Sequence, residues 1–194
     1  MKIGVLALQG AVQEHLKIIE KLGHEGIAVK KVEQLEDLNG LIIPGGESTV
    51  IGKLLRKYGF DNAIKDFSEH KKPLFGTCAG LILLAKEING FDDKYLGLMD
   101  IKAERNAFGR QKESFEVDLE VKGIASSFKA VFIRAPYIIE ASEDIEILAK
   151  FDNKIVAARQ NHLLCTAFHP ELTDDIRMHE YFLRMAEEYS DIKC

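Results

Sequence analysis

Cysteine is scarce in this sequence, and its three copies stand far apart, at Cys78, Cys165 and Cys194. An odd and widely spaced set is neither a disulfide framework nor a metal-ligand spacing. We therefore expect free thiols in a reducing cytoplasm. We also expect this chain to hold neither a metal nor a cofactor.

An excess of basic residues is missing as well. The chain has 26 Lys+Arg against 31 Asp+Glu, a formal net charge of −5, and no basic stripe of the kind that nucleic-acid binding needs. No apolar run is long enough to span a bilayer, and neither a basic leader nor a small-residue cleavage site opens the sequence. We expect no nucleic-acid partner, no membrane insertion and no processing.

The residues that are present fit one compact α/β domain over 1–194, since 46% are hydrophobic and a single core can be buried at this length. In the first half, short apolar runs alternate with amphipathic segments, and this order predicts a parallel sheet covered by helices on both faces. The predicted strands are 3–8, 27–32, 41–43 and 74–76. The predicted helices are 11–22, 49–58, 62–70 and 79–88.

The second half, 101–168, is rich in β-branched and aromatic residues, with turn signals at Lys122-Gly123, Asp152-Asn153 and Asn161-His162. This composition predicts antiparallel or mixed strands added to the sheet. A helix over 175–189 should close the fold. The predicted class is α/β, with a mostly parallel central sheet and added antiparallel strands.

Gly76-Thr77-Cys78-Ala79-Gly80 lies where a buried strand turns into a helix. The pattern is typical of a nucleophile elbow, with cysteine where hydrolases often carry serine, and its glycines permit the strained turn and close backbone contacts. A helix N-terminus and a nearby imidazolium lower a thiol pKa by about 1 to 5 units. The alternative is that Cys78 is a small buried hydrophobe.

His169-Pro170-Glu171 follows the apolar strand that ends near Phe168. Residues two apart in a strand point to the same side, so we expect His169 and Glu171 to face the same edge of the sheet. A carboxylate beside an imidazole fixes its tautomer and stabilises the imidazolium, which a Cys-His pair requires. An exposed turn without chemistry is the alternative. The other five histidines are interpreted as surface or packing residues.

Pro44-Gly45-Gly46-Glu47-Ser48 joins a buried strand to a helix, so its free amides are candidates to hold a developing oxyanion. It lacks the Gly-Lys-Ser/Thr end of a phosphate loop, and an ordinary turn is the alternative. Arg105 and Arg134 each stand beside apolar residues at strand ends and are candidates to clamp a carboxylate. Solvated arginine is the better interpretation of each from sequence alone.

These motifs together resemble the class I (triad) glutamine amidotransferases and, within them, the glutaminase subunits of pyridoxal 5′-phosphate synthase. The narrower resemblance rests on four further stretches of this sequence. They are Gly4-Val5-Leu6-Ala7-Leu8-Gln9-Gly10, Arg105-Asn106-Ala107-Phe108-Gly109-Arg110-Gln111, Ile133-Arg134-Ala135-Pro136 and Ala167-Phe168-His169-Pro170-Glu171-Leu172-Thr173.

The resemblance implies a flavodoxin-like three-layer domain and a thioester mechanism in which Cys78 attacks glutamine, His169 shuttles the proton and Glu171 orients His169. Backbone amides near Gly46 and Ala79 would form the oxyanion hole. The residues implied to hold glutamine are Gly46, Glu47, Ser48, Arg105, Ile133 and Arg134. Ammonia would pass to a barrel-shaped synthase subunit in a large hetero-oligomer.

Three alternatives stay open at this point. A chaperone or protease-like protein on the same elbow is disfavoured because such proteins typically place histidine directly after the cysteine, where Ala79 stands. A glutaminase of another pathway is disfavoured by the run that starts at Arg105. A non-enzymatic regulatory subunit with this fold is the third. Because Gly45-Gly46 can adopt two peptide orientations, we also hypothesise that the oxyanion hole forms only when the synthase docks.

Overall fold

The structure is a computed structural model in which residues 1–105 and 114–192 are described. The helices and 3₁₀ segments are α1 (Val12–Lys21), η1 (Val32–Leu35), α2 (Ser48–Lys57), α3 (Phe60–Glu69), α4 (Ala79–Leu84), η2 (Pro170–Leu172) and α5 (Arg177–Ile192). The strands are β1 (Lys2–Leu6), β2 (Glu25–Val29), β3 (Gly40–Ile43), β4 (Leu74–Thr77), β5 (Ala85–Ile88), β6 (Met99–Glu104), β7 (Ser114–Val121), β8 (Ala125–Ile133), β9 (Tyr137–Ala141), β10 (Glu146–Phe151), β11 (Lys154–Gln160) and β12 (Leu163–Thr166).

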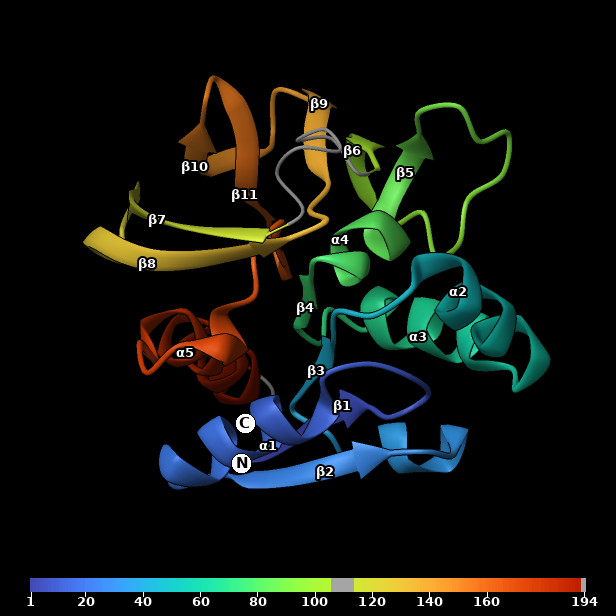
Figure 1. Ribbon diagram of the computed structural model, residues 1–194. Coiled ribbons are helices and arrows are strands. Elements are labelled where there is room, and N and C mark those ends of the chain that lie inside the picture. Colours follow the sequence, from blue (N-terminus) through green and yellow to red (C-terminus); the bar gives the residue numbers. More distant parts are fainter. Residues whose placement is uncertain (106–113, 193–194) are drawn as a thin grey trace.

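A mixed sheet in the order β2-β1-β3-β4-β12-β11-β9-β6-β5 runs through the described part of the chain, and β10 pairs with β11. The strands from β2 to β12 are all parallel, whereas β11 and β9 are antiparallel to their neighbours. Figure 1 shows α5 on one side of β3 and β4, with α2 and α3 on the other. The predicted α/β class, with a mostly parallel sheet, helices on both faces and added antiparallel strands, is confirmed.

Burial explains why the parallel half forms. Ile42, Ile43 and Phe75 on the central strands are completely buried, as expected for strands covered on both faces. From α5, Phe182 packs against Phe75, with ring centroids 5.5 Å apart. None of the helices in the described part of the chain combines the length and apolar character that a bilayer crossing requires.

Three predictions about individual elements were wrong. The helix predicted over 79–88 ends at Leu84, because Ala85–Ile88 pairs with β6 as strand β5. The strand predicted over 27–32 ends at Val29, and Val32 already begins η1. Finally, β7 and β8 do not join the main sheet but form a separate antiparallel pair.

Candidate active site

The ends of β4 and β12 position the candidate catalytic residues. The two strands are parallel neighbours in the register Thr77 to Thr166. Their carboxyl ends therefore meet at one edge of the sheet, where α/β proteins usually bind their ligands. The backbone N–H of Cys78 donates to the carbonyl of Thr166 at 2.8 Å, so the elbow after β4 is joined directly to the end of β12.

Cys78 has the backbone conformation of a strained elbow. Its φ is 50° and its ψ is −103°, a region that non-glycine residues rarely adopt and that costs about 1 to 3 kcal/mol. A Cβ on Gly76 would lie 2.6 Å from the carbonyl carbon and oxygen of Gly80, and a Cβ on Gly80 would lie 2.3 Å from the carbonyl oxygen of Ile43. Both glycines are therefore required by close backbone approach, as the motif predicts.

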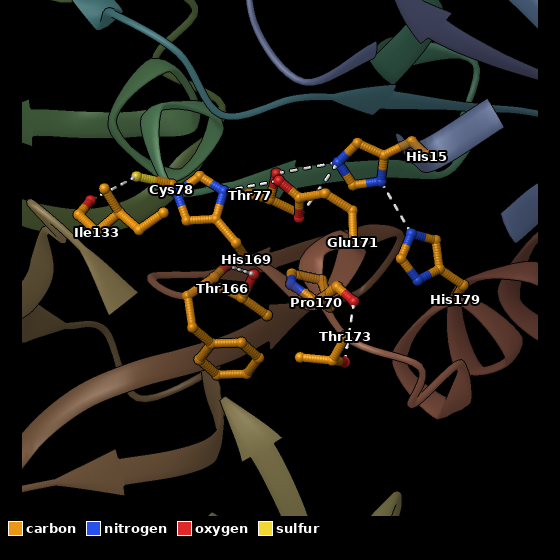
Figure 2. Close-up of polar contacts among 11 residues, drawn as sticks. His15, Thr77, Cys78, Ile133, Thr166, His169, Pro170, Glu171, Thr173 and His179 are labelled. Carbon is orange, nitrogen blue, oxygen red and sulfur yellow. Dashed lines mark hydrogen bonds and ion pairs between the residues drawn. The ribbon is translucent and has the colours of Figure 1, made fainter. Parts of the chain in front are cut away.

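His169 lies directly after β12 and beside the elbow. A hydrogen bond from Thr166 Oγ1 to the carbonyl of Phe168 shapes this turn, and the N–H of His169 donates to the carbonyl of Val131 in β8. A Cβ on Gly45 would lie 2.4 Å from His169 Cε1 and 3.4 Å from Cys78 Cβ. The imidazole and the thiol therefore share one wall of the site (Figure 2).

Glu171 completes the set, but not through strand alternation. The strand ends at Thr166, and Glu171 lies in the 3₁₀ turn Pro170–Leu172. The prediction that a strand points His169 and Glu171 to the same edge of the sheet was wrong in its geometry, because the 3₁₀ turn, and not a strand, brings the carboxylate to the imidazole. His169 Nδ1 lies 2.6 Å from Glu171 Oε1, and Glu171 is 5% exposed.

The contacts of His169 favour its protonated form. Burial by itself lowers the pKa of His169, but hydrogen bonds to Cys78 and Glu171, together with the charges of these groups, raise it to about 10. The carboxylate accepts the proton on Nδ1, which leaves Nε2 to exchange a proton with another group. Cys78 itself donates weakly to the carbonyl of Ile133, with Sγ 3.8 Å from the oxygen.

A cavity of about 580 Å³ opens over Cys78, and its volume lies in the usual range for small-molecule sites. Every predicted site residue except Glu171 lines it. These residues are Gly46, Glu47, Ser48, Cys78, Ala79, Arg105, Ile133, Arg134 and His169. Glu171 lies behind His169, which is the place expected of an orienting group.

Arg105 is not the solvated arginine that the sequence favoured. Its guanidinium stacks on Phe91, 4.8 Å from the ring centroid, and donates to the hydroxyl of Tyr95 at 3.0 Å. Its Nε is buried and has no hydrogen-bond partner within residues 1–105 and 114–192. Arg134 is exposed and has a positive φ of 44°. The rest of the predicted stretch, 106–111, lies outside the described residues.

Gln9 is a cavity residue that the reasoning from individual residues did not single out. Its side-chain oxygen accepts from the N–H of Glu47 at 2.8 Å, and a Cβ on Gly46 would lie 2.4 Å from it. The Glu47 carboxylate caps α2 by accepting from the backbone N–H groups of Thr49 and Val50, at 3.1 and 2.9 Å. In the sequence, the only signal for Gln9 was that it lies in the stretch Gly4 to Gly10.

Two histidines interpreted as surface or packing residues are buried behind Glu171. His15 in α1 and His179 in α5 join ring to ring, Nδ1 to Nε2, at 2.8 Å. Burial lowers the pKa of His179 to about 4, and burial, followed by His179 and His169, lowers the pKa of His15 well below its ordinary value. Both rings are therefore neutral at pH 7.

This burial predicts a loss of stability in acid. In the unfolded chain, His179 binds a proton below about pH 6.5, whereas in the folded chain it does so only below about pH 4. Stability therefore rises with pH across that window, and lowering the pH from 7.5 to 5 removes about 2 kcal/mol of the His179 contribution. In urea unfolding, the His179→Gln variant should lose about 2 kcal/mol less than the wild type between these pH values.

The wild type must be compared with the His179→Gln variant because the raised pKa of His169 changes stability with pH in the opposite direction. Its raised pKa contributes stability that is complete below about pH 6.5 and is lost as the pH rises towards 10. That contribution is common to both proteins and cancels in the difference. Equal losses of stability in the wild type and the variant would contradict the prediction for His179.

Comparison with known proteins identifies relatives that match nearly the whole length of this chain. The family described as the SNO glutamine amidotransferase family matches residues 5–188. The pyridoxal 5′-phosphate synthase subunit PdxT of Brevibacillus brevis is 62% identical over 97% of this chain and 99% of its own length. The protein of the same name from a Geobacillus species is 61% identical over 97% and 98%.

Solved structures agree with this match. A crystal structure of a glutamine amidotransferase is 51% identical, covers 95% of this chain and 98% of its own, and superimposes with a TM-score of 0.91. A putative GMP synthase protein from Thermoplasma acidophilum, 18% identical over 100% of this chain and 97% of its own, has a TM-score of 0.72 and shares the fold. The chain belongs to the SNO glutamine amidotransferase family.

Proposed function

We propose that this chain hydrolyses L-glutamine to L-glutamate and ammonia, and that it supplies the ammonia to a synthase subunit that makes pyridoxal 5′-phosphate. The observation that carries the proposal is the chain of contacts from Cys78 through His169 to Glu171 at the wall of a cavity. Relatives 61% and 62% identical over nearly their whole length are named as subunits of that synthase.

The reaction divides between the three side chains. The thiol proton of Cys78 passes to His169 as the sulfur attacks the side-chain amide carbon of glutamine, and His169 then gives this proton to the nitrogen as the carbon–nitrogen bond breaks and ammonia leaves. Water then attacks the thioester, with His169 accepting a proton from it, and glutamate is released with the thiol restored. Glu171 keeps the Nδ1 proton of His169 in place and stabilises the imidazolium.

The rest of the cavity would bind the substrate. The backbone amides of Gly46 and Ala79 would stabilise the oxyanion, because the first amides of a helix such as α4 have no intrahelical partner. We assign glutamine binding to Gly46, Glu47, Ser48, Arg105, Ile133 and Arg134. Support for Arg105 is its stacked guanidinium, whose buried Nε has no hydrogen-bond partner among residues 1–105 and 114–192 and which is therefore a preorganised donor for a carboxylate.

The remaining parts of the proposal concern the setting of the reaction. We propose one glutaminase domain over 1–194, which the family match over 5–188 supports. We further propose a cytoplasmic protein, supported by the free thiols of Cys78 and Cys165. The partner would be a barrel-shaped synthase subunit in a large hetero-oligomer, which would keep ammonia from becoming ammonium in water.

Ammonia release from glutamine, measured with and without the synthase subunit, tests this function. The carbonyl of Gly45 accepts from the N–H of Ala11 at 3.1 Å, which holds the Gly45-Gly46 peptide in one orientation. If docking turns this peptide to complete the oxyanion hole, the complex should hydrolyse glutamine about 100-fold faster than the isolated chain, the effect of one oxyanion donor. Equal rates would refute the docking step, and no hydrolysis by the complex would refute the function.

A further inference from the structure

Behind the carboxylate of Glu171 lies a pair of buried histidines that the proposed reaction does not use. His15 and His179 are 0% and 1% exposed, and neither lines the glutamine cavity. His15 Nε2 lies 3.6 Å from Glu171 Oε2 and 3.4 Å from Thr77 Oγ1, while its other ring nitrogen meets His179. Figure 2 shows the rings extending from the side of Glu171 that faces away from Cys78.

The contacts select one arrangement of protons. His179 Nδ1 is buried and has no hydrogen-bond partner within the described residues. Buried N–H groups without a partner are rarer in proteins than buried acceptors without one, so His179 carries its proton on Nε2 and donates it to His15 Nδ1. His15 then carries its own proton on Nε2, which faces Glu171 Oε2 and Thr77 Oγ1. The opposite arrangement would place a nitrogen lone pair against the carboxylate.

Glu171 needs such a neighbour because one hydrogen bond does not fix a carboxylate. The last torsion of glutamate is broad, so the contact of Oε1 with His169 leaves the group free to rotate. Oε2 is buried and has no hydrogen bond within 3.5 Å among the described residues. The Nε2–H of His15 is the donor placed beside it, 3.6 Å away.

We propose that His15 is a positioning residue for the reaction: its Nε2–H holds Glu171 Oε2 so that Oε1 stays on His169, while His179 fixes the tautomer of His15. The inference rests on the proposed glutaminase function and extends it to two side chains behind Glu171, those of His15 and His179. The chain Cys78, His169, Glu171, His15 and His179 then joins the elbow to α1 and α5.

The test compares His15→Leu with His15→Gln in complex with the synthase. Leucine removes the donor, and kcat for glutamine should fall about tenfold with KM nearly unchanged, the size found for comparable outer groups at metal sites. Glutamine places an amide N–H near the position of Nε2, and its oxygen can accept from His179, so this variant should recover most of kcat. A His15→Leu complex that is folded and has the wild-type kcat would overturn the proposal, as would equal loss in both variants.

A second measurement does not depend on glutamine turnover. The rate at which iodoacetamide alkylates Cys78, followed by peptide mass spectrometry, reports the thiolate that His169 stabilises. His15→Leu should slow this alkylation several-fold, and His15→Gln should restore it. If the wild-type complex hydrolyses no glutamine but alkylation behaves in this way, the proposed function fails while the positioning role stands. Unchanged alkylation in His15→Leu counts against the positioning role alone.

His179 supplies the decisive variants if His15→Leu does not fold. His179→Leu removes the proton donor to His15 without touching Glu171, so it should lower kcat in the same direction while KM stays constant. His179→Gln retains an N–H donor and should keep the activity. Wild-type kcat in a folded His179→Leu complex would refute the assigned tautomer and with it the proposal.

Discussion

Replacing Cys78 with alanine is expected to lower glutamine hydrolysis by the complex at least about 10⁴-fold, since loss of a nucleophile removes the covalent route altogether. Cys165 is completely buried in β12, and burial raises the pKa of its thiol to about 12, so it cannot substitute. Cys165→Ala is therefore the matched control and should leave kcat within about twofold. The measurement is glutamate formation at saturating glutamine.

The Cys78→Ala complex also separates lost chemistry from lost assembly. Given ammonium salt in place of glutamine, the synthase should still make its product, because the ammonia no longer has to come from the glutaminase site. More than about one hundredth of the wild-type glutaminase rate in Cys78→Ala would contradict the assignment of the nucleophile. Unimpaired product formation from glutamine, rather than from ammonium, in the Cys78→Ala complex would favour a non-enzymatic regulatory subunit.

Exchanging Glu171 for glutamine should lower kcat by up to about 10⁴-fold, the loss found when the orienting acid of a serine-protease triad becomes an amide. The amide can present an N–H to His169 Nδ1, which favours the tautomer that lacks a proton on Nδ1 and leaves the imidazolium without its counter-charge. Glu171 does not line the cavity, so KM for glutamine should change little.

Glu116→Gln on β7 is the matched control for this change. Glu116 is exposed and pairs only loosely with Lys129, at 3.9 Å, so its loss should alter neither kcat nor stability by a measurable amount. If Glu171→Gln kept more than about a tenth of the wild-type kcat, His169 would not depend on the carboxylate for its orientation. Steady-state kinetics of the two variants in the same complex decides between these outcomes.

Local sequence was sufficient for the parallel half of the fold and for the elbow. Hydrophobic residues recur at different spacings in buried strands and in amphipathic helices, so the two kinds of element can be told apart. The glycines at 76 and 80 identify a close turn irrespective of the rest of the chain. It was insufficient for 79–88, where every residue of α4 is buried, so the segment has no polar face to mark its period. Pairing with β6 turns Ala85–Ile88 into a strand, which only the tertiary structure determines.

The candidate site also combines one contact that the sequence predicted with one that only the tertiary structure creates. His169 and Glu171 stand two apart, and their pairing was predicted from that spacing, although a 3₁₀ turn rather than a strand brings them together. His15 and His179 are 164 positions apart, and no local pattern connects them. Only the packing of α1 and α5 on the same side of the sheet brings these rings behind Glu171.

The pairing of β12 with β4 has a consequence for how such a chain can change in length. Sliding β12 by one position would shift His169 by about 3.3 Å and turn the side chains of the strand to opposite faces. The strands could still pair after this slip, but the imidazole of His169 would no longer lie beside the sulfur of Cys78. An insertion or deletion between Leu163 and His169 would force this slip, so the length of this stretch is fixed by the site.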